Sequence, residues 1–149
     1  MERSGGADEL ARRIAGELRA REGTRAAWNI VIEDAREGYA RISMDVRQDM
    51  LNGHETAHGG MIFALADTAF AYACNSRNVT TVAQQASIVF LAPARLGETL
   101  VAEAVEQCLA GRSGVYNVRV RNAAGTDVAV FQGVSRAVGG PVLKEDPIN

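Results

Sequence analysis

Residues 61–74 form the longest apolar segment of the chain, and Asp67 is its only charged residue. The segment contains neither glycine nor proline, and its apolar residues occupy every side of a helix rather than one stripe. A helix of that kind is buried by its surroundings. The pattern therefore predicts a central helix that begins at Gly59-Gly60 and is covered by the rest of the chain.

A second helix is predicted near the N-terminus, over residues 7–22. Leu10, Ile14 and Leu18 recur at a spacing of four among mostly charged or small residues, which is typical of an amphipathic helix. It is expected to end near Gly23. Residues 1–7 are expected to form a loose end.

The remaining segments alternate as strands do. Residues 28–33 and 39–46 each alternate between the two faces of a strand, and the turn-forming residues 34–38 lie between them. This pattern predicts a hairpin, followed by a short helical turn at 47–51.

Four further strands are predicted towards the C-terminus, separated by turn signals rich in Gly, Pro and Asn. They are residues 79–91, 99–109, 114–122 and 127–138. Short connections favour an antiparallel meander. With the hairpin this gives an α+β fold, in which a long antiparallel sheet of about six strands wraps around one helix. Residues 139–149 are expected to be a loose tail, because they contain too few apolar residues to pack.

Composition narrows the functional classes. The chain of 149 residues fits a single domain, 1–149, with no internal repeat. Sixteen basic and eighteen acidic residues give a net charge of −2, and no basic block is present. A nucleic-acid partner is therefore not expected. Small molecules or further copies of the chain are the expected partners.

The sequence also predicts a cytoplasmic protein that does not enter the membrane. The first residues lack the apolar core of a leader, and the long apolar helix is shorter than a membrane span and contains Asp67. Cys74 and Cys108 are expected to be buried free thiols, as in a reducing compartment.

The start of the central helix is a candidate site for a developing negative charge. The first N–H groups of a helix have no partner within it, and two glycines leave them uncovered by side chains. The helix dipole adds to the attraction. Asp67 lies among apolar residues, where burial would raise the pKa of its carboxyl unless hydrogen bonds compensate. Asp67 as an internal cap or a satisfied core carboxylate is the structural alternative.

Residues 54–58 read His-Glu-Thr-Ala-His, which matches the zinc-binding motif of metalloproteases. That motif works on a helix, where both histidines share one face. Here Gly53 and Gly59-Gly60 bracket it, so a loop is expected, and the chain has no third histidine. No metal is therefore predicted.

Several of these residues together resemble the hotdog-fold acyl-CoA thioesterases, and most closely the type found in bacterial phenylacetic acid degradation, the PaaI type. They are Asn52, His58-Gly59-Gly60, Leu65-Ala66-Asp67-Thr68, Phe90-Leu91-Ala92-Pro93 and Gly97. The resemblance implies that Asp67 is the catalytic carboxylate, that the Gly59 amide binds the oxyanion, and that Asn52 and His58 position the reacting groups. It also implies that two protomers join their sheets and that such dimers pair into homotetramers.

The implied reaction is hydrolysis of an acyl-CoA, with phenylacetyl-CoA and its ring-hydroxylated relatives as the substrate class. No cofactor is needed, since coenzyme A is part of the substrate. Gly60, Thr68, Arg95 and Arg112 are candidate substrate-binding residues, the arginines because they suit phosphate recognition. Arg77 is a third candidate of this kind. The residues alone leave Asp67 open as nucleophile or general base, and leave open an acyl-CoA-binding module or a dehydratase of the same fold.

The helix geometry adds one expectation of its own. Gly59 and Asp67 are eight residues apart, which is roughly 12 Å along a helix at 1.5 Å per residue. A reacting oxygen must approach to about 3 to 3.5 Å. A site that uses both residues should therefore combine Gly59 of one protomer with Asp67 of its partner.

Overall fold

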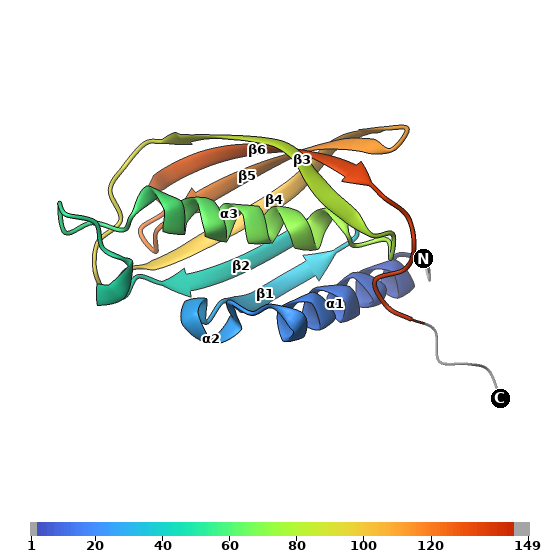
Figure 1. Cartoon of the computed structure of the whole chain (residues 1–149), viewed down its shortest axis with the longest axis horizontal. Coiled ribbons are helices and arrows are strands. Elements are labelled where there is room, and N and C mark those ends of the chain that lie inside the picture. Colours follow the sequence, from blue (N-terminus) through green and yellow to red (C-terminus); the bar gives the residue numbers. More distant parts are fainter. Residues whose placement is uncertain (1–2, 145–149) are drawn as a thin grey trace.

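The computed structural model describes residues 3–144, and one long helix, α3, lies across the concave face of a six-stranded antiparallel sheet (Figure 1). The elements in chain order are α1 (Arg3–Arg21), α2 (Arg25–Trp28), β1 (Val31–Arg36), β2 (Tyr39–Asp45), the 3₁₀ turn η1 (Gln48–Met50), α3 (Gly59–Cys74), β3 (Thr81–Phe90), β4 (Thr99–Ala110), β5 (Ser113–Arg121) and β6 (Asp127–Ala137). The expected fold class, the hairpin β1–β2 and the helical turn before the central segment are confirmed. Among the described residues, no helix is both long and apolar enough to cross a membrane.

The predicted meander is wrong for one strand. The sheet order is β1-β2-β4-β5-β6-β3, so β3 pairs with β6 and not with its successor β4. Two side-chain contacts fix the start of β3 beside the end of α3: Asn75 Nδ2 donates to the Thr81 carbonyl at 3.0 Å, and the Thr81 N–H donates to Asn75 Oδ1 at 2.9 Å. The segment 91–98 then carries the chain to β4, which lies beside β2. Strands that follow one another in sequence need not be neighbours in a sheet.

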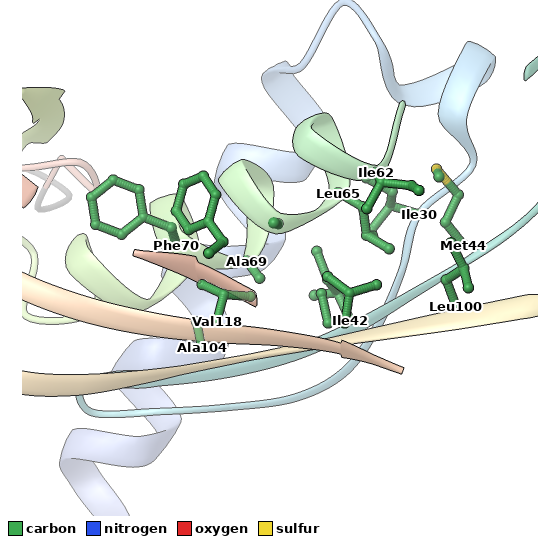
Figure 2. Close-up of a cluster of buried hydrophobic side chains, with 14 of the residues drawn as sticks. Ile30, Ile42, Met44, Ile62, Leu65, Ala69, Phe70, Leu100, Ala104 and Val118 are labelled. Carbon is green, nitrogen blue, oxygen red and sulfur yellow. The ribbon is translucent and has the colours of Figure 1, made fainter. Parts of the chain in front are cut away.

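Aromatic side chains join α3 to the sheet. Phe70 of α3 packs against Tyr116 and Phe131, with ring centroids 5.4 and 5.9 Å apart. Figure 2 shows Phe70, Ala69 and Leu65 on the side of the helix that faces Ala104 and Val118 of the sheet. Gly133 of β6 makes this approach possible, because a Cβ at that position would lie 2.8 Å from the Phe70 ring. The sheet therefore covers α3 as the apolar pattern predicted.

The N-terminal helix is longer than predicted. It begins at Arg3, so the loose end expected at residues 1–7 is wrong for residues 3–7, while residues 1–2 lie outside the described part. The amphipathic pattern is confirmed at Ile14, which is fully buried. The strand expected from Trp28 begins later, because Trp28 ends the short helix α2 and Asn29 adopts a left-handed conformation before β1.

The predicted loose tail is also wrong over residues 139–144; residues 145–149 lie outside the described part. Val142 is only 4% exposed. Asn78 Oδ1 accepts hydrogen bonds from the backbone N–H groups of Val142 and Leu143 at 3.0 and 2.8 Å. Arg21 of α1 donates to the Val142 carbonyl at 2.9 Å. A few backbone contacts thus hold a segment that apolar content alone would not.

Replacing Asn78 should release this segment. Asn78 has a positive φ of 64°, so Asn78→Gly tolerates the backbone conformation. It removes the side-chain acceptor and also the Nδ2 donor, which lies 3.3 Å from the Leu143 carbonyl oxygen. Loss of an acceptor for two backbone donors should lower the free energy of unfolding by about 1 to 3 kcal/mol. Urea unfolding measures the loss, and faster hydrogen exchange at the Val142 and Leu143 amides should accompany it. Unchanged exchange there would show that Asn78 does not hold the segment.

Strand β3 forms one edge of the sheet, and its outer edge has no partner strand within residues 3–144 (Figure 1). All ten of its residues are exposed or half-buried. Val82, Val89 and Phe90 are 47%, 60% and 51% exposed. An open apolar edge of this length favours addition of another strand.

Candidate active site

The loop before α3 is organised by Asn52. Its Oδ1 accepts hydrogen bonds from the backbone N–H groups of His54 and Thr56, at 2.9 and 3.2 Å, and lies 3.3 Å from the Thr56 hydroxyl. Asparagine often closes turns in this way. The loop in turn brings His58 to the Met50 carbonyl, to which the His58 N–H donates at 2.8 Å.

His58 caps α3, and its cap distinguishes the two glycines. The Gly60 N–H donates to His58 Nδ1 at 3.0 Å. The Gly59 N–H, by contrast, has no acceptor within residues 3–144. The expectation that both N–H groups are free is therefore wrong for Gly60. At the positive end of α3, the Gly59 N–H remains available for an anionic or carbonyl oxygen.

Asp67 lies at the middle of α3, half-buried on the side that faces β3 and the C-terminal segment. Burial raises the pKa of its carboxyl, and no hydrogen bond from a described residue compensates. If Asp67 were an internal cap or a satisfied core carboxylate, hydrogen-bond donors would have to contact its oxygens. The carboxylate is therefore held in a partly dry environment with its oxygens unused by the fold.

This environment predicts a pH-dependent cost to stability. Because the folded-state pKa of Asp67 is raised, the folded chain holds its proton more tightly than the unfolded chain does. The cost is absent below the ordinary carboxyl pKa, grows as pH rises to the raised value, and is constant above it. We therefore expect Asp67→Asn to be more stable than the wild type at neutral pH, with the gap closing in acid. Chemical unfolding of both proteins across pH measures this gap, and a constant gap would contradict the argument.

The single chain does not bring Gly59 and Asp67 together. A cavity of about 380 Å³ is lined by Asn52, Gly59 and Phe90. A second cavity, of about 460 Å³, is lined by Asp67 together with residues of α1, β3 and the C-terminal segment. None of the described residues lines both cavities, which agrees with their separation along α3. We call them the Gly59 cavity and the Asp67 cavity.

The side chains that were predicted to bind substrate lie in different environments. Thr68 is buried, and its hydroxyl donates to the Ala64 carbonyl of its own helix at 2.7 Å. Arg95 is exposed beside the Gly59 cavity, where it pairs with Thr56 in an isolated bridge. Arg112 is exposed and lines a separate cavity of about 230 Å³. Arg77 is engaged otherwise, by ion pairs to Glu37 and Glu106 at 2.8 Å each.

The histidine motif lies in a loop, as predicted. Residues 54–57 precede the helix, with Glu55 at a positive φ of 63°, and His58 is the cap rather than a helical residue. Within residues 3–144, no group of three or more His, Cys, Asp or Glu side chains is arranged to hold a metal.

The two cysteines differ from each other. Cys74 lines the Asp67 cavity, and burial together with the Asp67 charge raises the pKa of its thiol to about 12, so it remains protonated at neutral pH. A protonated thiol is a poor nucleophile. Cys108 is exposed, so the expectation of two buried thiols is wrong for this one. It lies on β4 just after the bulge and pairs with Val115 of β5.

A hydrogen-bonded pair of polar residues in the Asp67 cavity was not predicted from the sequence. Glu22, just after α1, accepts a hydrogen bond from the Tyr72 hydroxyl at 2.7 Å, and both line the cavity. They are fifty residues apart, and Tyr72 is part of an apolar run that favours a core role. No local signal in the sequence connects them.

Comparison with known proteins shows the family to which the chain belongs. The model of the Thioesterase superfamily matches residues 54–129, which include the cap, Gly59 and Asp67. The acyl-coenzyme A thioesterase PaaI of Escherichia coli K12 is 44% identical over 119 residues, covering 80% of this chain and 85% of that protein. The chain therefore belongs to the thioesterase superfamily, and the resemblance to PaaI-type enzymes is confirmed.

Solved structures extend the likeness to the whole fold. The E. coli PaaI protein superimposes with a TM-score of 0.88 at 40% identity, over 90% of this chain and 97% of that one. A Streptococcus mutans protein bound to acetyl-CoA has a TM-score of 0.73 at 26% identity, over 76% and 91%. The fold is the hotdog fold, and the chain is a thioesterase.

Proposed function

We propose that this protein hydrolyses the thioester bond of aryl-acyl-CoA substrates such as phenylacetyl-CoA and its ring-hydroxylated forms. The observation that carries the proposal is a pair of groups on α3, the Gly59 N–H and the Asp67 carboxylate, to which no residue of the described part of the chain hydrogen-bonds. The name of the E. coli relative supports acyl-CoA as the substrate, and the name of its operon, phenylacetic acid degradation, supports the aryl group.

The proposed chemistry uses few groups and no cofactor. The substrate carbonyl oxygen accepts a hydrogen bond from the Gly59 N–H, and the helix dipole stabilises the charge that develops there. The Asp67 carboxylate either attacks the carbonyl carbon or takes a proton from the attacking water. The carbon–sulfur bond then breaks, and the coenzyme A thiolate leaves and takes a proton. If water has attacked, the free acid forms directly. If Asp67 has attacked, a mixed anhydride of Asp67 and the acyl group forms, and a water molecule hydrolyses it to the free acid and restores the carboxylate.

The proposed site forms between two protomers. Gly59 and Asp67 line separate cavities of one chain, whereas the open edge of β3 suits pairing with the same strand of a second copy. A two-fold axis at that edge makes the interface symmetric and creates two equal sites. We further propose that two such dimers assemble into a homotetramer, and that the enzyme acts in the cytoplasm.

The remaining predicted residues receive supporting roles. Asn52 and His58 shape the loop that presents Gly59, the latter by occupying the Gly60 N–H. Thr68 holds its turn of α3 next to Asp67. Arg95 and Arg112, both exposed, are proposed to meet the phosphates of coenzyme A.

Mixing two inactive variants should restore activity if the site is shared. Gly59→Pro removes the oxyanion donor and Asp67→Asn removes the carboxylate. Random pairing of equal amounts makes half of the dimers mixed, and each mixed dimer contains one intact site. About a quarter of all sites should therefore recover. The measurement is thiol release after the variants are unfolded together and refolded. No recovery, in mixtures shown to contain mixed dimers, would place both groups in one chain.

The function itself is tested by following thiol release from phenylacetyl-CoA with the purified wild type. Steady release that depends on Asp67 supports the thioesterase. Binding without release would indicate an acyl-CoA-binding module. Hydration of an enoyl-CoA, with no thiol release, would indicate a dehydratase.

A further inference from the structure

We propose that Glu22, held by Tyr72, recognises a hydroxyl group on the far end of the substrate's acyl group inside the Asp67 cavity. This inference rests on the proposed function and deepens it, because it assigns a specificity-determining residue.

The Asp67 cavity lies at a suitable distance from the reacting carbon. Asp67 and Tyr72 are five residues apart on α3, which is roughly 7.5 Å along the helix axis. That distance is comparable to the span from the carbonyl of an arylacetyl group to the far edge of its ring. An acyl group whose carbonyl lies at Asp67 can therefore place its ring near Tyr72 and Glu22.

Apolar side chains line the cavity between Asp67 and Tyr72. Phe70, Ala71 and Cys74 share one stripe of α3 with Asp67, at spacings of three, four and seven residues. Leu18 of α1 and Val142 of the C-terminal segment lie on other walls. The volume of about 460 Å³ is in the range of small-molecule sites. This apolar lining suits an aromatic ring.

Tyr72 and Glu22 form a hydrogen-bonded polar pair in this cavity. The Tyr72 hydroxyl donates to Glu22 Oε1 at 2.7 Å, and Tyr72 is 1% exposed while Glu22 is half-buried. The bond occupies one carboxylate oxygen and fixes the side chain. The second oxygen remains able to accept a hydrogen bond. A carboxylate that can only accept will favour a ligand that donates, such as a phenolic hydroxyl.

Part of the cavity wall lies outside the range that the family model matches. The superfamily model matches residues 54–129, whereas Glu22, Leu18 and Val142 lie outside that range. The catalytic groups proposed above lie inside it. Glu22 thus comes from a segment outside the matched range, whereas its partner Tyr72 lies on α3 with the proposed catalytic groups.

The test measures binding rather than turnover, so that it stays separate from the proposed reaction. Asp67→Asn protein is titrated with phenylacetyl-CoA, 3-hydroxyphenylacetyl-CoA and 4-hydroxyphenylacetyl-CoA. We expect at least one hydroxylated thioester to bind about tenfold more tightly than the plain one, as for a hydrogen bond to a charged group. In Asp67→Asn/Glu22→Gln this preference should fall by about tenfold, since a neutral acceptor is weaker.

Two further variants complete the design. Glu9→Gln, also in the Asp67→Asn background, removes an exposed carboxylate of α1, the helix that Glu22 follows, and should keep the preference. Tyr72→Phe leaves the carboxylate but removes its support, so it should reduce the preference by a smaller factor, and it serves if Glu22→Gln does not fold. Equal binding of all three thioesters, or a preference that survives in folded Glu22 and Tyr72 variants, would overturn the inference. A preference seen in a wild type that releases no thiol would instead refute the proposed hydrolysis alone.

Discussion

Asp67→Asn should lower kcat for phenylacetyl-CoA by at least about 100- to 1000-fold, the range found for loss of one transition-state-stabilising group. The amide has nearly the shape of the carboxylate, but it can neither attack a carbonyl nor take a proton from water. The fold should tolerate the change, because no described residue donates a hydrogen bond to Asp67. Thiol release under saturating substrate measures the effect.

The matched control is Asp49→Asn, the same substitution at an exposed residue of η1. It should keep wild-type turnover. Equal turnover in Asp67→Asn and wild type would remove Asp67 from the mechanism. Asp67→Asn is also expected to be the more stable protein at neutral pH. Chemical unfolding of the variant therefore shows whether a loss of activity comes from unfolding or from the missing carboxylate.

Gly59→Pro should produce a loss of similar size, about 100- to 1000-fold in kcat, while the helix is preserved. Gly59 is the first residue of α3, a position at which proline is favoured because its missing N–H has no intrahelical role. His58 before it is extended, with φ −59° and ψ 137°, which is the conformation that a following proline requires. The substitution thus removes one hydrogen-bond donor, keeps the backbone conformation at the start of the helix, and adds a side chain beside Phe90.

Gly59→Ala separates the effect of losing the N–H donor from the effect of adding a side chain. Both substitutions add a Cβ, which at this position would lie 2.9 Å from the Phe90 ring. Phe90 is 51% exposed and can move aside. Alanine retains the N–H, so Gly59→Ala should be much more active than Gly59→Pro. Equal losses in the two variants would attribute the effect to crowding by Phe90 and not to the oxyanion donor.

Much of this fold follows from local patterns. The apolar run of α3, the spacing of Leu10, Ile14 and Leu18, and the alternation of the strands each reflect a single face or side of an element, which local sequence encodes. The order of strands in the sheet does not. It depends on where the chain lies after α3, and that position is set by the contacts of Asn75 with Thr81.

In the candidate site, too, some features follow from local sequence and others depend on contacts between distant residues. Gly59 and Asp67 could be predicted because a glycine pair at a helix start and a lone carboxylate in an apolar helix are locally unusual. Which of the two glycine N–H groups is capped depends on the position of the His58 ring, whose Nδ1 accepts the hydrogen bond from the Gly60 N–H. That position is a matter of three-dimensional geometry. The pairing of Glu22 with Tyr72 joins two segments fifty residues apart, and the packing of residues 139–144 depends on backbone hydrogen bonds to Asn78. Such long-range contacts leave no local pattern.

The edge of β3 also bears on how the protein must be produced. Its sequence, Thr-Val-Ala-Gln-Gln-Ala-Ser-Ile-Val-Phe, contains no charged residue and no proline. Strands that remain permanently exposed usually contain lysine, proline or an inward-facing charge, which discourage other chains from adding to them. A newly synthesised chain with this edge still open is therefore vulnerable to non-native strand addition. Rapid association with a second copy would protect it, so a substitution that weakens association should reduce the soluble yield even where the fold of each chain is intact.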